Sequence, residues 1–120
     1  MKPAAISLAV YGGYLLANGV ALLLAPGVTL GLLGLPPAEE PWIRVLGLVA
    51  GEIGYYFLVA VRKDIPAFYP ATVYGRGFAA LVFLALVVSK VGPLQLLLFG
   101  AVDLLTSVWT YLAIKREREA

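Results

Sequence analysis

The chain has 120 residues, of which 62% are hydrophobic and 13% are charged, and its formal net charge is +2. A soluble domain of this length cannot bury so much apolar surface, which excludes a soluble globular fold. The cations flank the apolar runs, and this placement gives no indication of a nucleic-acid partner. Since the chain contains no Cys and no His, disulfides, thiolate nucleophiles and metal sites built on imidazole or thiolate are also excluded, and nothing indicates a metal, a cofactor or a catalytic residue.

The first predicted span covers residues 5–24. It is longer than the apolar core of a usual signal peptide, so we expect a retained helix. Asn18 lies ~12 Å from the outer end of this helix, near mid-depth. Polar residues at helical spacing form a stripe that should face other helices: Ser7, Tyr11, Tyr14 and Asn18. After Pro26 and Gly27, residues 28–35 are apolar but too short to span, and we expect them to lie along the interface or to cap the helix bundle.

The second predicted span covers residues 42–61 and follows a proline-rich turn. Gly47 and Gly51 form a GxxxG pair, which lets helix backbones approach closely. We expect packing within the chain, with a homo-oligomer contact as the alternative use of this pair. Glu52 lies at the centre of the span, ~15 Å from Arg62 at 1.5 Å per residue.

The third and fourth predicted spans cover residues 71–91 and 93–114. The preceding loop carries Phe68 and Tyr69, an aromatic pair suited to headgroup level. In the fourth span, four residues at intervals of three and four occupy one helix face: Gly100, Asp103, Ser107 and Thr110. A charged tail, residues 115–119, follows as a solvated anchor.

Four spans place both termini and the loop after Arg62 on one side of the membrane. That side receives most of the cations near the span ends: Lys2, Arg62, Lys63, Lys115, Arg116 and Arg118. Only Arg44 and Lys90 lie near the other boundary. The positive-inside rule therefore predicts a multi-pass protein of the inner (plasma) membrane with both termini cytoplasmic.

Two acids fall at mid-depth, because Asp103 is ~18 Å from Lys115 and so lies level with Glu52. A carboxyl group there costs roughly 2.5–3.5 kcal/mol on insertion scales. The two acids could be neutral and hydrogen-bonded, could share a proton, or could face a wet cavity that binds a cation or a basic ligand. Arg76, ~9 Å below the cytoplasmic boundary, is expected to extend out to that boundary, unless it turns inward and pairs with the acids.

The sequence thus predicts an all-α four-helix transmembrane bundle, one domain over residues 1–120, with a polar site inside it. The leading hypothesis is the binding of a lipid or of a small amphipathic or cationic ligand, coupled to protons if the acids titrate. An accessory or scaffold protein, whose polar residues only hold helices together, is the second hypothesis, and an acid/base isomerase is the third. The expected ligand-binding residues are Asn18, Glu52, Tyr55, Arg76, Asp103, Ser107 and Thr110.

Four segments carry a resemblance to known proteins: Trp42-Ile-Arg-Val-Leu-Gly-Leu, Gly54-Tyr-Tyr-Phe-Leu-Val-Ala, Tyr74-Gly-Arg-Gly-Phe and Phe99-Gly-Ala-Val-Asp-Leu-Leu. They resemble segments of small uncharacterised bacterial four-helix membrane proteins, and the size and helix count are loosely similar to the DoxX family. Because such families have no established activity, the resemblance implies a fold and a membrane location only.

Overall fold

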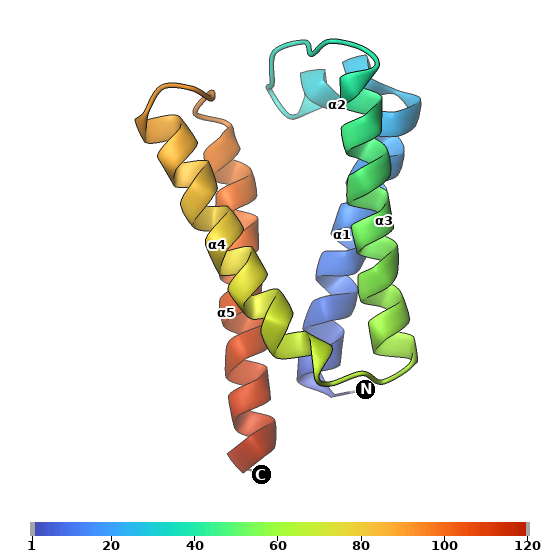
Figure 1. Ribbon diagram of the computed structural model, residues 1–120, viewed down its shortest axis with the longest axis vertical. Helices are drawn as coiled ribbons and strands as arrows, with labels where there is room; N and C mark the ends of the chain where they lie inside the picture. Colours follow the sequence, from blue (N-terminus) through green and yellow to red (C-terminus); the bar gives the residue numbers. More distant parts are fainter. Residues whose placement is uncertain (1, 120) are drawn as a thin grey trace. The chain divides into compact units, whose positions relative to one another are not determined.

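A computed structural model describes residues 2–119, and over these residues the protein is helical without any strand. The helices, in chain order, are α1 (Pro3–Leu24), α2 (Pro26–Leu32), α3 (Trp42–Arg62), α4 (Phe68–Val88) and α5 (Leu96–Glu119) (Figure 1). Four of them, all but α2, are long and apolar enough to cross a membrane. The predicted all-α class with four membrane-length helices is confirmed.

The observed helix bounds differ from the predicted ones most at four ends, those of α4 and α5. α4 ends at Val88, three residues before the predicted end, and α5 begins at Leu96, three residues after its predicted start. α4 begins at Phe68, three residues before the predicted start. Pro70 is its third residue, and a proline in the first turn removes no intrahelical hydrogen bond, because the first N–H groups have no partner there. α5 runs on to Glu119, so the charged tail is helical.

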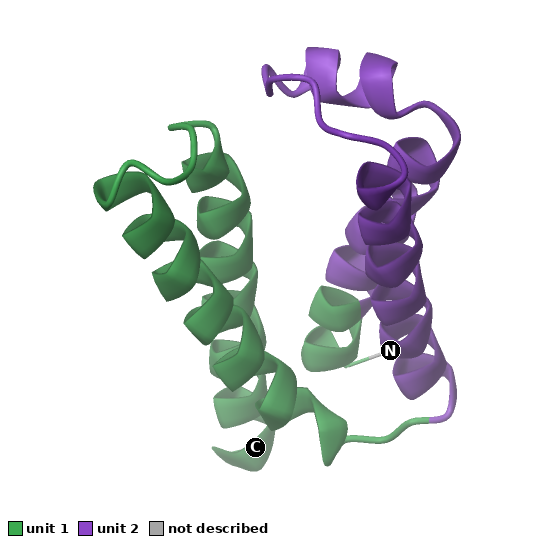
Figure 2. Ribbon diagram, turned by 45° about the horizontal axis from the view of Figure 1, so that its top comes forward, with its two compact units in different colours: residues 1–8, 64–120 green, residues 9–63 purple. Residues whose placement is uncertain are grey.

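The chain forms two compact units, which we describe separately (Figure 2). Unit 1 contains Met1–Leu8 and Asp64–Ala120, and unit 2 contains Ala9–Lys63. α1 therefore contributes its first residues to unit 1 and the rest to unit 2. That the two units act as one domain stays a prediction.

In unit 2, α1 and α3 pack through glycines. A Cβ atom added at Gly47 would lie 2.8 Å from the carbonyl oxygen of Gly19, and one added at Gly54 would lie 2.6 Å from the carbonyl oxygen of Gly12. A Cβ at Gly19 would overlap the backbone of Gly51. The two backbones approach as closely as small residues allow. Gly47 and Gly51 thus serve packing within the chain, as expected, while a homo-oligomer through them stays a prediction.

The end of unit 2 that contains α2 is held by hydrogen bonds to carbonyl groups at the end of α1. Thr29 in α2 donates to the carbonyl of Ala21 at 3.0 Å. Arg44 in α3 donates from Nη1 to the carbonyl of Leu23 at 2.7 Å and from Nε to Glu40 at 2.9 Å. The Ala21 carbonyl also accepts the backbone N–H of Ala25 at 2.8 Å. Carbonyl groups in the last turn of a helix have no partner within that helix, so the Arg44 contact to Leu23 acts as a C-terminal cap. The Arg44 guanidinium also lowers the pKa of the exposed Glu40 carboxyl, mainly through this hydrogen bond.

In unit 1, α4 and α5 pack side by side, joined by the short connection between Val88 and Leu96 (Figure 1). A Cβ at Gly100 would lie 3.3 Å from the Cβ of Phe83, which is closer than an ordinary contact, so the small residue lets α4 and α5 approach closely here. The Phe83 and Phe99 rings are 6.1 Å apart between centroids. Apolar contacts therefore hold this part of the pair together.

Two helices end with the same backbone turn but with different residues in it. After α2, Gly34 has φ 72°, and Leu35 donates to the carbonyl of Leu30 at 2.9 Å. After α4, Lys90 has φ 65°, and Val91 donates to the carbonyl of Leu86 at 3.0 Å. Both turns are Schellman motifs, in which the left-handed position favours glycine. Lys90 occupies that position with a side chain.

Candidate functional site

The polar face of α5 is buried in unit 1. Asp103, Ser107 and Thr110 are 5%, 4% and 0% exposed, and Gly100 is buried on the same face. Ser107 donates to the carbonyl of Leu104 at 2.8 Å, so its hydroxyl is satisfied within its own helix. The predicted inward face of the fourth span is confirmed.

Thr110 is the centre of a hydrogen-bond cluster that joins three helices of unit 1. Its Oγ1 lies 2.6 Å from the Oγ of Ser7, in the first part of α1, and accepts a hydrogen bond from Nη2 of Arg76 in α4 at 2.9 Å. It also lies 3.0 Å from the carbonyl of Thr106 as a donor. The Ser7 hydroxyl lies 2.7 Å from the carbonyl of Ala4. One threonine hydroxyl therefore ties α1, α4 and α5 together.

The two hydroxyl groups at the centre of this cluster have fewer protons than contacts. Ser7 and Thr110 carry one hydroxyl proton each, whereas three contacts need one of these protons: Ser7 to Ala4, Ser7 to Thr110, and Thr110 to Thr106. Two of the three contacts can hold a proton at one time. Because the cationic Arg76 donates to Thr110, it polarises that hydroxyl and makes it the better donor.

Arg76 lies inside unit 1 with 3% of its surface exposed. Its Nε donates to the carbonyl of Thr72 at 3.1 Å, and Nη2 donates to the Thr72 hydroxyl at 3.0 Å and to Thr110. The prediction that Arg76 extends out to the boundary is wrong. Its side chain does point toward the start of α4, but the Thr72 and Thr110 hydroxyls receive it before it reaches the surface. Arg76 thus turns inward, as in the alternative, while its pairing with the acids stays a prediction.

The other predicted site residues lie in unit 2. Glu52 and Tyr55 are exposed, and Asn18 is half-buried with its Nδ2 donating to the carbonyl of Tyr14 at 2.9 Å. Glu52 and Tyr55 line a groove of about 400 Å³ beside Gly19, Gly47 and Gly51. The predicted set therefore divides between the units, with Arg76, Asp103, Ser107 and Thr110 in unit 1. That Glu52 and Asp103 form one centre stays a prediction.

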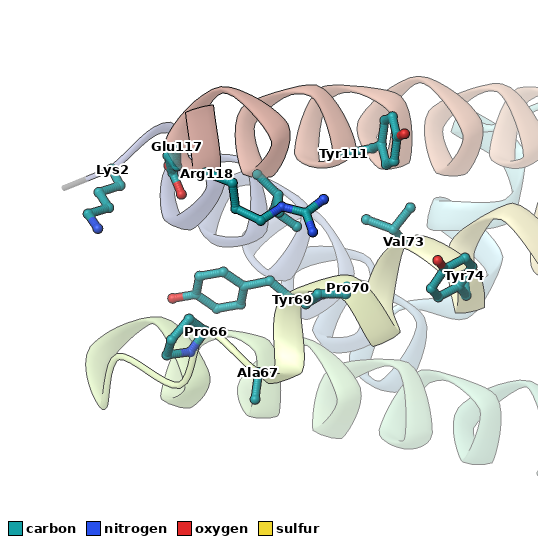
Figure 3. A pocket seen from close by; sticks show the side chains of 11 residues that line it. Lys2, Pro66, Ala67, Tyr69, Pro70, Val73, Tyr74, Tyr111, Glu117 and Arg118 are labelled. Carbon is teal, nitrogen blue, oxygen red and sulfur yellow. The ribbon is translucent and has the colours of Figure 1, made fainter. Parts of the chain in front are cut away.

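Beside the buried cluster, unit 1 contains a pocket of about 500 Å³ that the sequence did not indicate (Figure 3). We call it the terminal pocket, because its residues lie just before α1, at or just before the start of α4, and in the second half of α5. It is lined by Lys2, Pro66, Ala67, Tyr69, Pro70, Val73, Tyr74, Tyr111, Ile114, Glu117 and Arg118. Ionic groups and aromatic rings thus share one cavity at one end of the unit.

Tyr69 is the most buried aromatic residue of the terminal pocket, with 5% of its surface exposed. Its hydroxyl is buried and has no hydrogen-bond partner among residues 2–119. In Figure 3 this hydroxyl points to the side of the pocket on which Lys2 and Glu117 lie. Buried hydroxyls are rarely left without a partner, so this group is a candidate contact for a ligand.

Glu117, which lines the terminal pocket, also contacts the start of α1. Its Oε1 accepts a hydrogen bond from the backbone N–H of Ala4 at 3.1 Å. A carboxylate at a helix N-terminus satisfies a free N–H group and interacts favourably with the helix dipole. The prediction of a wholly solvated charged tail is therefore wrong for Glu117, which is half-buried. Only its position in the final turn of the last helix could have indicated this contact.

No family model, curated protein or solved structure matches this chain. Among residues 2–119, no group of three acidic side chains is arranged to hold a metal ion.

Proposed function

We propose that this protein is a multi-pass protein of the plasma membrane, with both termini cytoplasmic, that binds a lipid or a small amphiphile in unit 1. Four membrane-length helices and the excess of cations beside the termini support this placement. Under this topology, the terminal pocket lies at the cytoplasmic boundary, because Lys2 and Glu117 flank helix ends on that side.

The observation that carries the proposal is the composition of the terminal pocket. Charged groups from Lys2, Glu117 and Arg118 occur together with an apolar wall that includes Val73 and Ile114. An amphiphile has the same two parts, a polar headgroup and an apolar chain, and binding pockets of several hundred Å³ are the usual size for small ligands. The terminal pocket, with a volume of about 500 Å³, fits a headgroup and the first part of an acyl chain.

The buried cluster is connected to residues of both walls of this pocket. Thr72 donates to the carbonyl of Tyr69 at 2.7 Å, and Thr110 directly precedes Tyr111. The Arg76 contacts to Thr72 and Thr110 therefore fix the spacing of the two pocket walls on α4 and α5. We assign Arg76, Ser107 and Thr110 to positioning these walls, and Asp103 to the same buried face.

A cavity-filling substitution tests this function. Val73 lines the pocket, whereas Val88 lies at the far end of the same helix with 72% of its surface exposed. We expect Val73→Trp to reduce the lipid that stays bound to the detergent-purified chain, measured by native mass spectrometry. Val88→Trp is the matched control and should retain wild-type binding. Equal lipid retention by both variants and the wild type would refute binding in this pocket.

A second candidate function, that of an accessory or scaffold protein, has its own supporting observation. The hydroxyl groups of Ser107 and Thr72 bond to carbonyls of their own helices, as groups that only stabilise packing would do. If no lipid adduct survives purification while Thr110→Val lowers the melting temperature, the scaffold function is favoured.

A further inference from the structure

We infer that the terminal pocket takes the phosphodiester group of an anionic glycerophospholipid, with Lys2, Arg118 and the Tyr69 hydroxyl as its contacts. This inference rests on the proposed function and names the headgroup chemistry of the ligand. It follows from the charge of the pocket, from the Tyr69 hydroxyl and from the position of the apolar wall.

The charge balance of the pocket favours one negative charge. Three ionic residues line it, the cations Lys2 and Arg118 and the anion Glu117. Glu117 already accepts the backbone N–H of Ala4, so one of its oxygens is engaged at the start of α1. Two cations and one acid leave a net charge of +1, which a phosphodiester of charge −1 neutralises. A zwitterionic lipid would leave that charge uncompensated.

The geometry supplies donors from two walls. Figure 3 shows the Arg118 side chain extending from α5 over the pocket, while Tyr69 lies on the α4 side. Guanidinium and ammonium groups are the side chains that bind phosphate oxygens most strongly, and a phenol adds one neutral donor. Because the Tyr69 hydroxyl is buried and has no partner among residues 2–119, a phosphate oxygen would satisfy it.

The apolar wall makes a lipid a better occupant than free phosphate. Tyr74 and Tyr111 line the pocket and are 78% and 49% exposed, so the pocket opens between rings that face outward. Tyrosine rings are typical of the membrane–water interface, where an acyl chain could leave the pocket beside them. An inorganic anion would use the cations and leave this wall without a function.

The same helix offers a matched control for simple charge attraction to an anionic surface. Lys115 and Arg116 lie within three residues of Arg118 but line a different pocket, together with Trp109 and Leu112. The double substitutions K2Q/R118Q and K115Q/R116Q therefore remove the same charge. Only the first pair removes it from the terminal pocket.

The experiment compares the binding of three lipids that differ in the charge of their headgroups. The delipidated full chain is titrated with phosphatidylglycerol, phosphatidylethanolamine or phosphatidylcholine, and bound lipid is counted by native mass spectrometry. We expect phosphatidylglycerol to bind most tightly. K2Q/R118Q should weaken phosphatidylglycerol binding about 10-fold or more, since each cation near an anionic lipid contributes roughly 5-fold in affinity. K115Q/R116Q should change it less than about 2-fold.

A single hydroxyl tests the third contact. Tyr69→Phe should weaken phosphatidylglycerol binding by about 3- to 10-fold, the usual range for one lost hydrogen bond. Tyr55→Phe, which removes an exposed hydroxyl in unit 2, is the control and should leave binding unchanged. Melting temperatures of all variants show whether each one is folded.

Each outcome bears on a different claim. If the three lipids bind equally, the headgroup inference is wrong while lipid binding stands, whereas failure of every lipid to bind refutes the proposed function itself. Equal losses for K2Q/R118Q and K115Q/R116Q would reduce the effect to surface charge and overturn the inference. Displacement of the lipid by millimolar sodium phosphate would identify free phosphate as the ligand and also overturn it.

Discussion

The helices of the two units are held together by different kinds of contact. In unit 2, α1 and α3 meet through Gly12, Gly19, Gly47 and Gly54, so that backbone lies against backbone. In unit 1, α4, α5 and the start of α1 meet through hydroxyls and the buried Arg76. Lipid chains are as apolar as leucine, so helices need either close approach or polar contacts to associate. Each unit uses one of these two means. The groove beside the glycine contact of unit 2 carries one ionic residue, Glu52, whereas the pocket of unit 1 carries three, Lys2, Glu117 and Arg118.

The largest effect should come from adding a single methyl group to the glycine contact of unit 2. A Cβ at Gly19 would meet the backbone of Gly51 and Gly47, which cannot move aside as a flexible side chain can. We expect Gly19→Ala to lower the free energy of unfolding by about 3–4 kcal/mol. Thermal unfolding in detergent measures this loss.

Gly13 provides the control for this substitution. It lies in the same helix, and a Cβ there would meet no atom within 4 Å. Gly13→Ala should therefore be neutral or stabilising by up to about 1 kcal/mol, the helix-propensity difference. If Gly19→Ala behaves like Gly13→Ala, unit 2 is not held by close backbone approach.

The next effect concerns the buried cation of unit 1. Arg76→Ala removes the donor shared by Thr72 and Thr110 and leaves a cavity at a side chain that is 3% exposed. We expect a loss of about 2–3 kcal/mol in the free energy of unfolding. Arg44→Ala removes the same side chain where it is 41% exposed, so its cost should be clearly smaller than that of Arg76→Ala. Similar melting temperatures for the two variants would contradict the structural role of Arg76.

How far the sequence could predict this molecule depends on which contacts are local. Apolar runs and prolines predicted four membrane-length helices, and the spacing of Asp103, Ser107 and Thr110 predicted a buried face. Ser7 belongs to a polar stripe that was expected to face other helices, but nothing in the sequence paired that stripe with Thr110. Thr72 carries no distinguishing pattern, and both residues lie far from Thr110 in the chain. For the same reason the terminal pocket was missed, since it joins the two ends of the chain to the start of α4.

A smaller effect should follow from removing the hydroxyl at the centre of the cluster. Thr110→Val keeps the shape of the side chain but deprives Arg76 and Ser7 of their shared partner. We expect a loss of about 1–2 kcal/mol in the free energy of unfolding. Thr106→Val, whose hydroxyl bonds only to carbonyls of its own helix, should cost about 0.5 kcal/mol or less. Equal losses would mean that the contacts between helices add nothing to those within α5.

The smallest change in the free energy of unfolding should come from substitutions in the turns that end α2 and α4. Both turns place a residue at positive φ, glycine at Gly34 in unit 2 and lysine at Lys90 in unit 1. Lys90→Gly should raise the free energy of unfolding by about 0.5–1 kcal/mol, because glycine adopts this conformation without steric cost. Gly34→Ala should lower it by about 1 kcal/mol for the same reason. Lys90→Asn separates the backbone effect from the lost charge, because asparagine tolerates the left-handed conformation and is neutral. Destabilisation by both Lys90 variants would show that the lysine charge, and not the turn, determines the stability of this end of unit 1.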